Sequence, residues 1–194
     1  MKMNLIALTC LIFLGISATA QSLAENRTDT ATGGRIIRTN NNSGGDLTLD
    51  DSVVKDGAVF FSAGYQSAKP GSKLVGMYFI ELYIIHNDNR LGCLNEYDSR
   101  IVLQLEDGTK IDCFQISESD CDPVTFQAGF ALMPRNGTPE TMKENFEKLL
   151  TTNISGLVIV TSEKKMDFKI KKSSREAMKK HFALIDKTLK SSAK

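Results

Sequence analysis

The feature that most constrains the fold is a β-hairpin in the middle of the chain. Residues 100–105 and 110–116 have strand-like composition and flank the pair Asp107-Gly108. Asp-Gly is preferred in a tight primed turn, whose two central residues both need positive φ. The pair therefore predicts two adjacent antiparallel strands. Cys113 faces residue 102 in a two-residue turn and residue 101 if the turn carries a one-residue bulge.

Other segments read as further strands of the same sheet. The segment 77–85 is apolar on both faces except at Glu81, which predicts a central strand. The remaining candidates are rich in β-branched and aromatic residues or follow a helix as a strand pair, and they cover residues 58–62, 126–133, 154–161 and 165–170.

Two helices are expected after residue 137. The first has Thr138 as N-cap and Pro139 at its first position, and the second opens with the capping-box pattern Ser173-x-x-Glu176. Each carries an apolar stripe at helical spacing, which predicts that it faces the core. Strands followed by late helices indicate an α+β fold, with an antiparallel sheet of about six to seven strands and two helices in the C-terminal half.

The first twenty residues read as a cleavable signal peptide. Lys2 is followed by an apolar run from residue 5 to 16 and by Ala18-Thr19-Ala20, a small-x-small cleavage pattern. The leader resembles bacterial signal peptides in which Gln follows the cleavage site. Export to the periplasm or the cell exterior is therefore expected. Lipid attachment at Cys10 stays an alternative, although Leu8-Thr9 before it do not fit that pattern.

The rest of the chain divides into two parts. Residues 21–49 contain runs of small polar residues such as Asn40-Asn-Asn-Ser-Gly-Gly45, which bury too little surface to offset the entropy of ordering. They predict a flexible N-terminal arm with at most a short strand at 35–38. Residues 50–194 are expected to form a single α+β domain.

The cysteines beyond the leader are Cys93, Cys113 and Cys121. In an exported protein they allow one disulfide. The hairpin register places Cys93 opposite residue 122 or Cys121, which favours a Cys93–Cys121 bridge with Cys113 buried as a small apolar residue. A Cys113–Cys121 bridge is the alternative.

Charge is distributed unevenly along the chain. Residues 163–194 contain eleven lysines and arginines and four acidic residues, whereas residues 21–162 contain twelve and nineteen. A basic helix of this kind binds an anionic surface or docks on its own acidic sheet. The candidate binding residues are basic side chains at the start of the last helix: Lys171, Lys172, Arg175, Lys179 and Lys180.

Signals of catalysis are weak. His86 is expected in a loop and His181 on a solvated helix face, and neither has the neighbours that a zinc site requires. The acidic runs 46–51 and 118–122 lack the glycine and distal glutamate of a calcium loop. No phosphate loop or cofactor motif is found, and nucleic-acid binding is not expected.

These observations predict an exported binding or interaction module of the cell envelope without catalytic activity. Its partner would be an anionic surface or an envelope protein. Two alternatives remain: a hydrolase whose site lies near Glu81, His86 and residues 87–96, and a structural component of an envelope assembly. The sequence does not decide whether the basic helix packs on the sheet or stands away from it.

Overall fold

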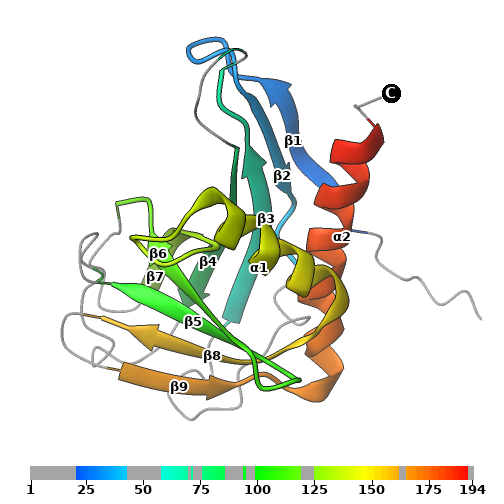
Figure 1. Cartoon of the computed structure of the whole chain (residues 1–194). Coiled ribbons are helices and arrows are strands. Elements are labelled where there is room, and N and C mark those ends of the chain that lie inside the picture. The colour runs from blue at the N-terminus through cyan, green and yellow to red at the C-terminus, as the bar shows by residue number, and fades with distance from the viewer. Residues whose placement is uncertain are drawn as a thin grey trace, which may run out of the picture.

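The computed structural model describes residues 21–42, 58–69, 71, 76–85, 94, 99–118, 125–161 and 165–191. They form one antiparallel sheet of nine strands in the order β1-β2-β3-β4-β7-β6-β5-β8-β9, with two helices (Figure 1). The predicted α+β class is confirmed, and the sheet has more strands than expected. The elements, in chain order, are β1 Leu23–Thr28, β2 Arg35–Thr39, β3 Ala58–Gln66, β4 Met77–Ile85, β5 Arg100–Leu105, β6 Lys110–Gln115, β7 Thr125–Ala131, α1 Pro139–Thr151, β8 Ile154–Val160, β9 Lys165–Lys169 and α2 Arg175–Ser191.

The two extra strands, β1 and β2, lie where a flexible arm was expected: residues 21–42 are ordered, and β2 covers the short strand allowed at 35–38. β1 and β2 form a hairpin that adds to the sheet through β3. The small polar residues between them form its turn: Asp29 accepts hydrogen bonds from the Ala31 amide and from Thr32 Oγ1. Gly33 has φ 67°, which favours glycine. The small polar residues that predicted a flexible arm therefore supply the hydrogen bonds and the left-handed backbone conformation of this turn.

The central hairpin has the bulged register. Ile101 faces Cys113 and Arg100 faces Phe114. Gly108 has φ 85° whereas Asp107 does not have positive φ, so the turn is not the two-residue primed type. A three-residue loop with glycine in the left-handed position gives this geometry.

The sheet bends at the seam between β6 and β7. These strands pair only at Phe114–Ala131 and Gln115–Phe130, whereas β4 pairs with every residue of β7. On one side of the seam β1, β2 and β3 run steeply, and on the other β5, β8 and β9 run across them (Figure 1). β4 lies between β3 and β7, which confirms the predicted central strand.

Both helices pack on the inner face of this bent sheet. Thr138 caps α1 by accepting a hydrogen bond from the Thr141 amide, and Pro139 occupies the first turn, as predicted. The prediction for the second helix is wrong in detail. Residues 172–174 form a 3₁₀ turn, so α2 begins at Arg175 and Ser173 is not its N-cap. α2 contacts β2 and β3 on one side of the seam and β8 on the other.

An aromatic cluster joins α1, α2 and the sheet. The Tyr78 ring of β4 stacks on Phe146 of α1, with ring centroids 4.0 Å apart. Phe182 of α2 meets Phe61 of β3 and Phe146 edge to face, at 5.8 and 6.1 Å. Edge-to-face and stacked pairs at these distances stabilise beyond the area that they bury. This cluster fixes α2 on the sheet.

Candidate functional site

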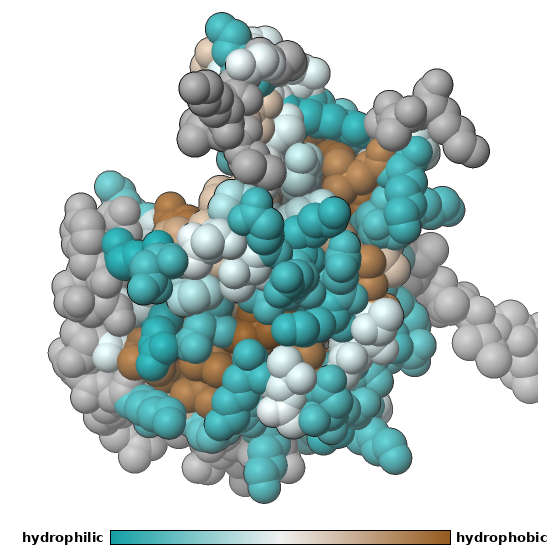
Figure 2. Space-filling model, in the orientation of Figure 1, coloured by the Kyte–Doolittle hydropathy of each residue, from teal (hydrophilic) through white to brown (hydrophobic). Residues whose placement is uncertain are grey.

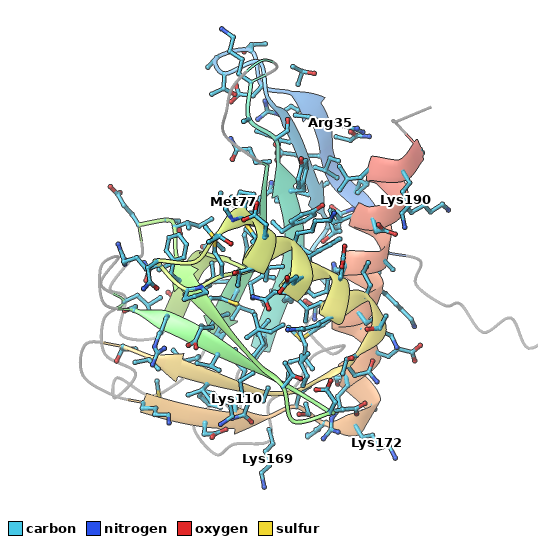
Figure 3. The ribbon with its side chains drawn as sticks, in the orientation of Figure 1. Arg35, Met77, Lys110, Lys169, Lys172 and Lys190 are labelled. Atoms are coloured by element: carbon cyan, nitrogen blue, oxygen red, sulfur yellow. The ribbon has the colours of Figure 1, made fainter. Side chains whose placement is uncertain are left out.

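The exposed side of α2 carries a row of lysines, which we call the lysine face. Lys180, Lys187 and Lys190 are exposed at helical spacing. Figure 3 shows Lys190 near the end of α2 and Lys172 just before its start. Hydrophilic residues line the outer side of α2, while apolar residues lie where the helix meets β1 and β2 (Figure 2). A helix of 17 residues is about 25 Å long, so the lysine face spans much of the molecule. Its members are Lys171, Lys172, Lys179, Lys180, Lys187 and Lys190.

Few acidic groups neutralise this face. Lys190 Nζ lies 2.7 Å from Asp186 Oδ2 within the helix. Glu176 is exposed in the first turn. Within the ranges that the structure covers, none of the other lysines of the face makes an ion pair. The lysine face therefore keeps most of its positive charge.

The opposite side of α2 is locked in the core. Met178, Phe182 and Ile185 are almost fully buried. His181 is also fully buried and does not lie on a solvated face, so that expectation was wrong. Its Nδ1 lies 2.7 Å from Thr39 Oγ1 of β2, and its ring meets Phe61 edge-on at 5.1 Å. The helix therefore cannot leave the sheet without exposing its apolar side.

Arg175 differs from the other predicted binding residues because its charge has a partner. Its Nη1 donates to Glu106 Oε1 at 3.0 Å, and its Nε donates to the Ile170 carbonyl. Hydrogen bonds from Arg175 and from Asn153 hold the pKa of Glu106 below its usual value. Arg175 thus ties the start of α2 to the β5–β6 turn.

The remaining predicted binding residues lie along one end of the lysine face. Lys171 and Lys172 are exposed just before α2, Lys180 is exposed on it, and Lys179 is half-buried. Sequence reasoning missed Lys187 and Lys190. The signal was present, because Lys187 lies two helical turns after Lys180 and Lys190 one turn further.

The second predicted region, around Glu81, holds a polar network on the outer face of the sheet. Glu81 Oε2 accepts hydrogen bonds from Ser62 Oγ at 2.7 Å and from Arg38 Nη1 at 3.3 Å. Arg38 also lies 3.4 Å from Glu25 of β1. Glu81 is therefore an ion-paired residue of the sheet surface. His86 and residues 87–93 lie outside the described residues, and so does most of the run 94–96.

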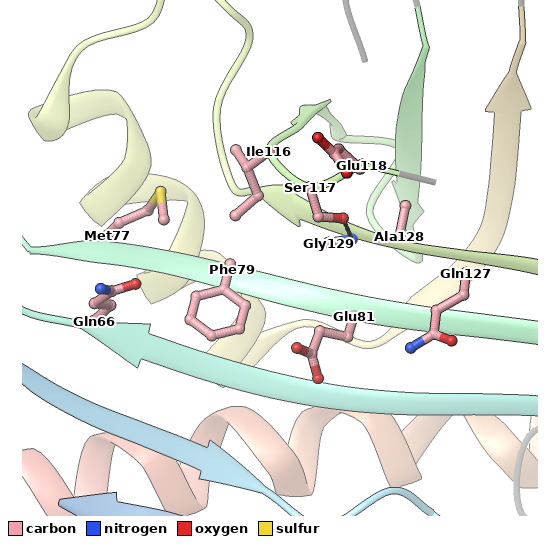
Figure 4. Close-up of a pocket in the computed structure, with 10 residues that line it drawn as sticks. All are labelled: Gln66, Met77, Phe79, Glu81, Ile116, Ser117, Glu118, Gln127, Ala128 and Gly129. Carbon is pink, nitrogen blue, oxygen red and sulfur yellow. Dashed lines mark hydrogen bonds between the residues drawn. The ribbon is translucent and has the colours of Figure 1, made fainter. Parts of the chain in front are cut away.

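Beside Glu81 the outer face is hollowed into a groove of about 630 Å³. Its floor is formed by β4 and β7, and its wall by residues 116–118 after β6 (Figure 4). Ser117 Oγ accepts a hydrogen bond from the Gly129 amide at 2.8 Å, which holds the wall over β7. The lining residues are Gln66, Met77, Phe79, Glu81, Ile116, Ser117, Glu118, Gln127, Ala128 and Gly129.

The thiol of Cys113 is buried and free, which is against the alternative Cys113–Cys121 bridge. Burial, with a smaller effect of Asp112, raises the pKa of this thiol, so it stays protonated at neutral pH. The favoured Cys93–Cys121 bridge concerns residues outside the described ranges.

The described residues contain neither a metal-ligand cluster nor a membrane-spanning helix. No group of His, Cys, Asp and Glu among them is placed to hold a metal ion. Neither helix in the described ranges is long and apolar enough to cross a membrane.

Comparison of the chain with protein-family models, with curated proteins and with solved structures found no match.

Proposed function

We propose that this protein is an exported, non-catalytic binding module whose lysine face binds a densely anionic surface, namely the headgroup layer of an anionic membrane. The observation that carries the proposal is the two-sided character of α2. One side is fixed in the core by Phe182 and its neighbours, and the other presents lysines that are largely without acidic partners in the described part of the chain.

This arrangement favours one mode of membrane contact. Interfacial helices normally bury an apolar side among the lipid chains. The apolar side of α2 is occupied by the sheet, so the helix binds the headgroups face-on, by charge alone. A cluster of lysines near an anionic surface contributes about 1 kcal/mol per side chain, and salt screens this attraction within about 10 Å.

Vesicle co-sedimentation tests the proposal with the chain that starts at Gln21, because the apolar leader would otherwise insert by itself. Binding is expected on phosphatidylglycerol vesicles at low salt, and loss of binding is expected at about 0.5 M salt. The double variant Lys180→Gln/Lys187→Gln should weaken binding by about 2 kcal/mol, or roughly thirtyfold.

The matched control is Lys69→Gln/Lys143→Gln, which removes the same formal charge from exposed positions that are not part of α2. Equal weakening by both double variants would show that net charge and not the lysine face matters. Binding that persists in high salt would show insertion, and binding to no anionic vesicle would reject the proposal. Truncation before α2 is not a useful test, because it would remove core residues such as Ile185.

A further inference from the structure

The groove over β4 and β7 lies on the outer face of the sheet, whereas α2 covers the inner face. The register shows this separation: Glu81 and Phe79 alternate with Ile80 and Leu82, which are fully buried in the core. A ligand in the groove would therefore not compete with a membrane at the lysine face.

One part of the groove is apolar. The Phe79 ring lies flat across β3 because residue 64 is glycine; a Cβ there would be 2.1 Å from Phe79 Cζ. Met77 and Ile116 lie beside this ring (Figure 4). Together they form a surface on which an alkyl chain of a ligand can pack.

The other part is polar and carries negative charge. Glu81 uses Oε2 for Ser62 and Arg38, and its Oε1 has no partner in the described part of the chain. Glu118 is exposed on the wall and has no ion pair there either. Gln127 adds an amide carbonyl that accepts hydrogen bonds. Arg38 neutralises only one of the two carboxylates.

We propose that this groove binds a protonated amine or guanidinium group carried on an apolar stem. The stem would pack along Phe79, and the cation would donate to Glu81 and Glu118. Hydrogen bonds between a cation and carboxylates are about twice as strong as neutral ones, which gives the site a preference for charge as well as shape. Both a free alkyl amine and a basic peptide side chain have this chemistry.

NMR titration of the isotope-labelled chain from Gln21, which contains every described element, tests the site. The probes are agmatine, the blocked tripeptide acetyl-Ala-Arg-Ala-amide, and the same peptide with neutral citrulline. The amides of Gly129 and Ser117 should shift with agmatine or with the arginine peptide and not with the citrulline peptide. If only agmatine binds, the ligand is a free alkyl amine. If the arginine peptide binds more tightly than agmatine, the ligand is a basic side chain of a peptide.

Two variants test the placement of the ligand. Glu118→Gln should weaken binding roughly tenfold, while Glu144→Gln, an exposed acid on α1, should not. Gly129→Ala should fill the groove without unfolding, because its Cβ would lie 3.5 Å from Ile116 and 3.6 Å from Ser117 Oγ. Equal shifts with arginine and citrulline peptides, no shift with either cation, or unchanged affinity in Glu118→Gln would overturn the proposal.

Discussion

The hairpins β1–β2 and β5–β6 belong to the same sheet but are stabilised in different ways. In β5–β6, buried and half-buried residues alternate along both strands, and the turn is set by Gly108. In β1 no residue is fully buried, and β2 buries only Ile37 and Thr39. The Thr39 hydroxyl hydrogen-bonds the backbone of Ala63 on β3 and also lies 2.7 Å from Nδ1 of His181, which is 142 residues away in the chain. One hairpin therefore depends on local sequence, and the other on a helix formed at the end of the chain.

Substitution of Ile37 by Ala should have the largest effect. Ile37 is fully buried in the core, so the variant should lose about 2 to 5 kcal/mol of unfolding free energy. Amide exchange should accelerate most in β1 and β2, because their attachment to the core is weakened. Urea unfolding and hydrogen exchange measure the two effects.

Ile36→Ala is the matched control for this substitution. Ile36 is the same residue type on the same strand, but it lies on the outer face and is half-buried. Its loss should be clearly smaller. Equal losses for the two variants would mean that β2 is not held by the inner face, and the contrast between the hairpins would fail.

This contrast explains what the sequence could reveal about the fold. The hairpin β5–β6, the strand β4 and the cap of α1 have local signals: a turn pair, an apolar run and a Thr-Pro start. β1 has none, and for β2 the sequence offered only a short strand at 35–38, because both strands are ordered by packing on β3 and α2. Composition alone therefore placed the start of the folded domain near residue 50, although strands begin at Leu23.

Substitution of Gly108 by Ala should have a smaller effect, confined to β5–β6. Gly108 has φ 85°, and nothing lies within 4 Å of the position of an added Cβ. The cost is therefore backbone strain alone, about 1 to 2 kcal/mol for an L-residue in the left-handed region. Urea unfolding should show this loss while exchange in β1 and β2 keeps its pattern.

Gly108→Asn provides the comparison for this turn, because asparagine adopts left-handed conformations more readily than alanine. It should restore part of the stability lost in the alanine variant. If alanine at this position were neutral, the turn would not set the hairpin, and β5–β6 would depend on tertiary packing as β1–β2 does.

The candidate site was predictable to a similar, partial extent. The basic end of the chain marked the lysine face, and helical spacing could have extended it to Lys187. The ion pair of Arg175 could not be predicted from the spacing of charges along the chain, because its partner, Glu106, lies 69 residues away. The groove could not be predicted from the sequence either, because its lining comes from β4, β7 and the segment after β6, which are brought together only by the folding of the sheet.

The smallest predicted effect concerns the long-range ion pair between the β5–β6 turn and α2. The carboxylate of Glu106 should titrate below its reference pKa of 4.5, mainly because of Arg175 and then of Asn153. Since the folded pKa is the lower one, this contact stabilises the fold above about pH 4.5 and is lost as the pH falls through the folded pKa.

In Arg175→Gln, carbon-detected NMR should show the titration midpoint of Glu106 moving up towards 4.5. The midpoint of Glu140, lowered by its own backbone amide and by Thr138, should stay unchanged. If the titration midpoint of Glu106 stays unchanged in this variant, Arg175 does not pair with Glu106 in solution. The turn of β5–β6 would then be independent of α2.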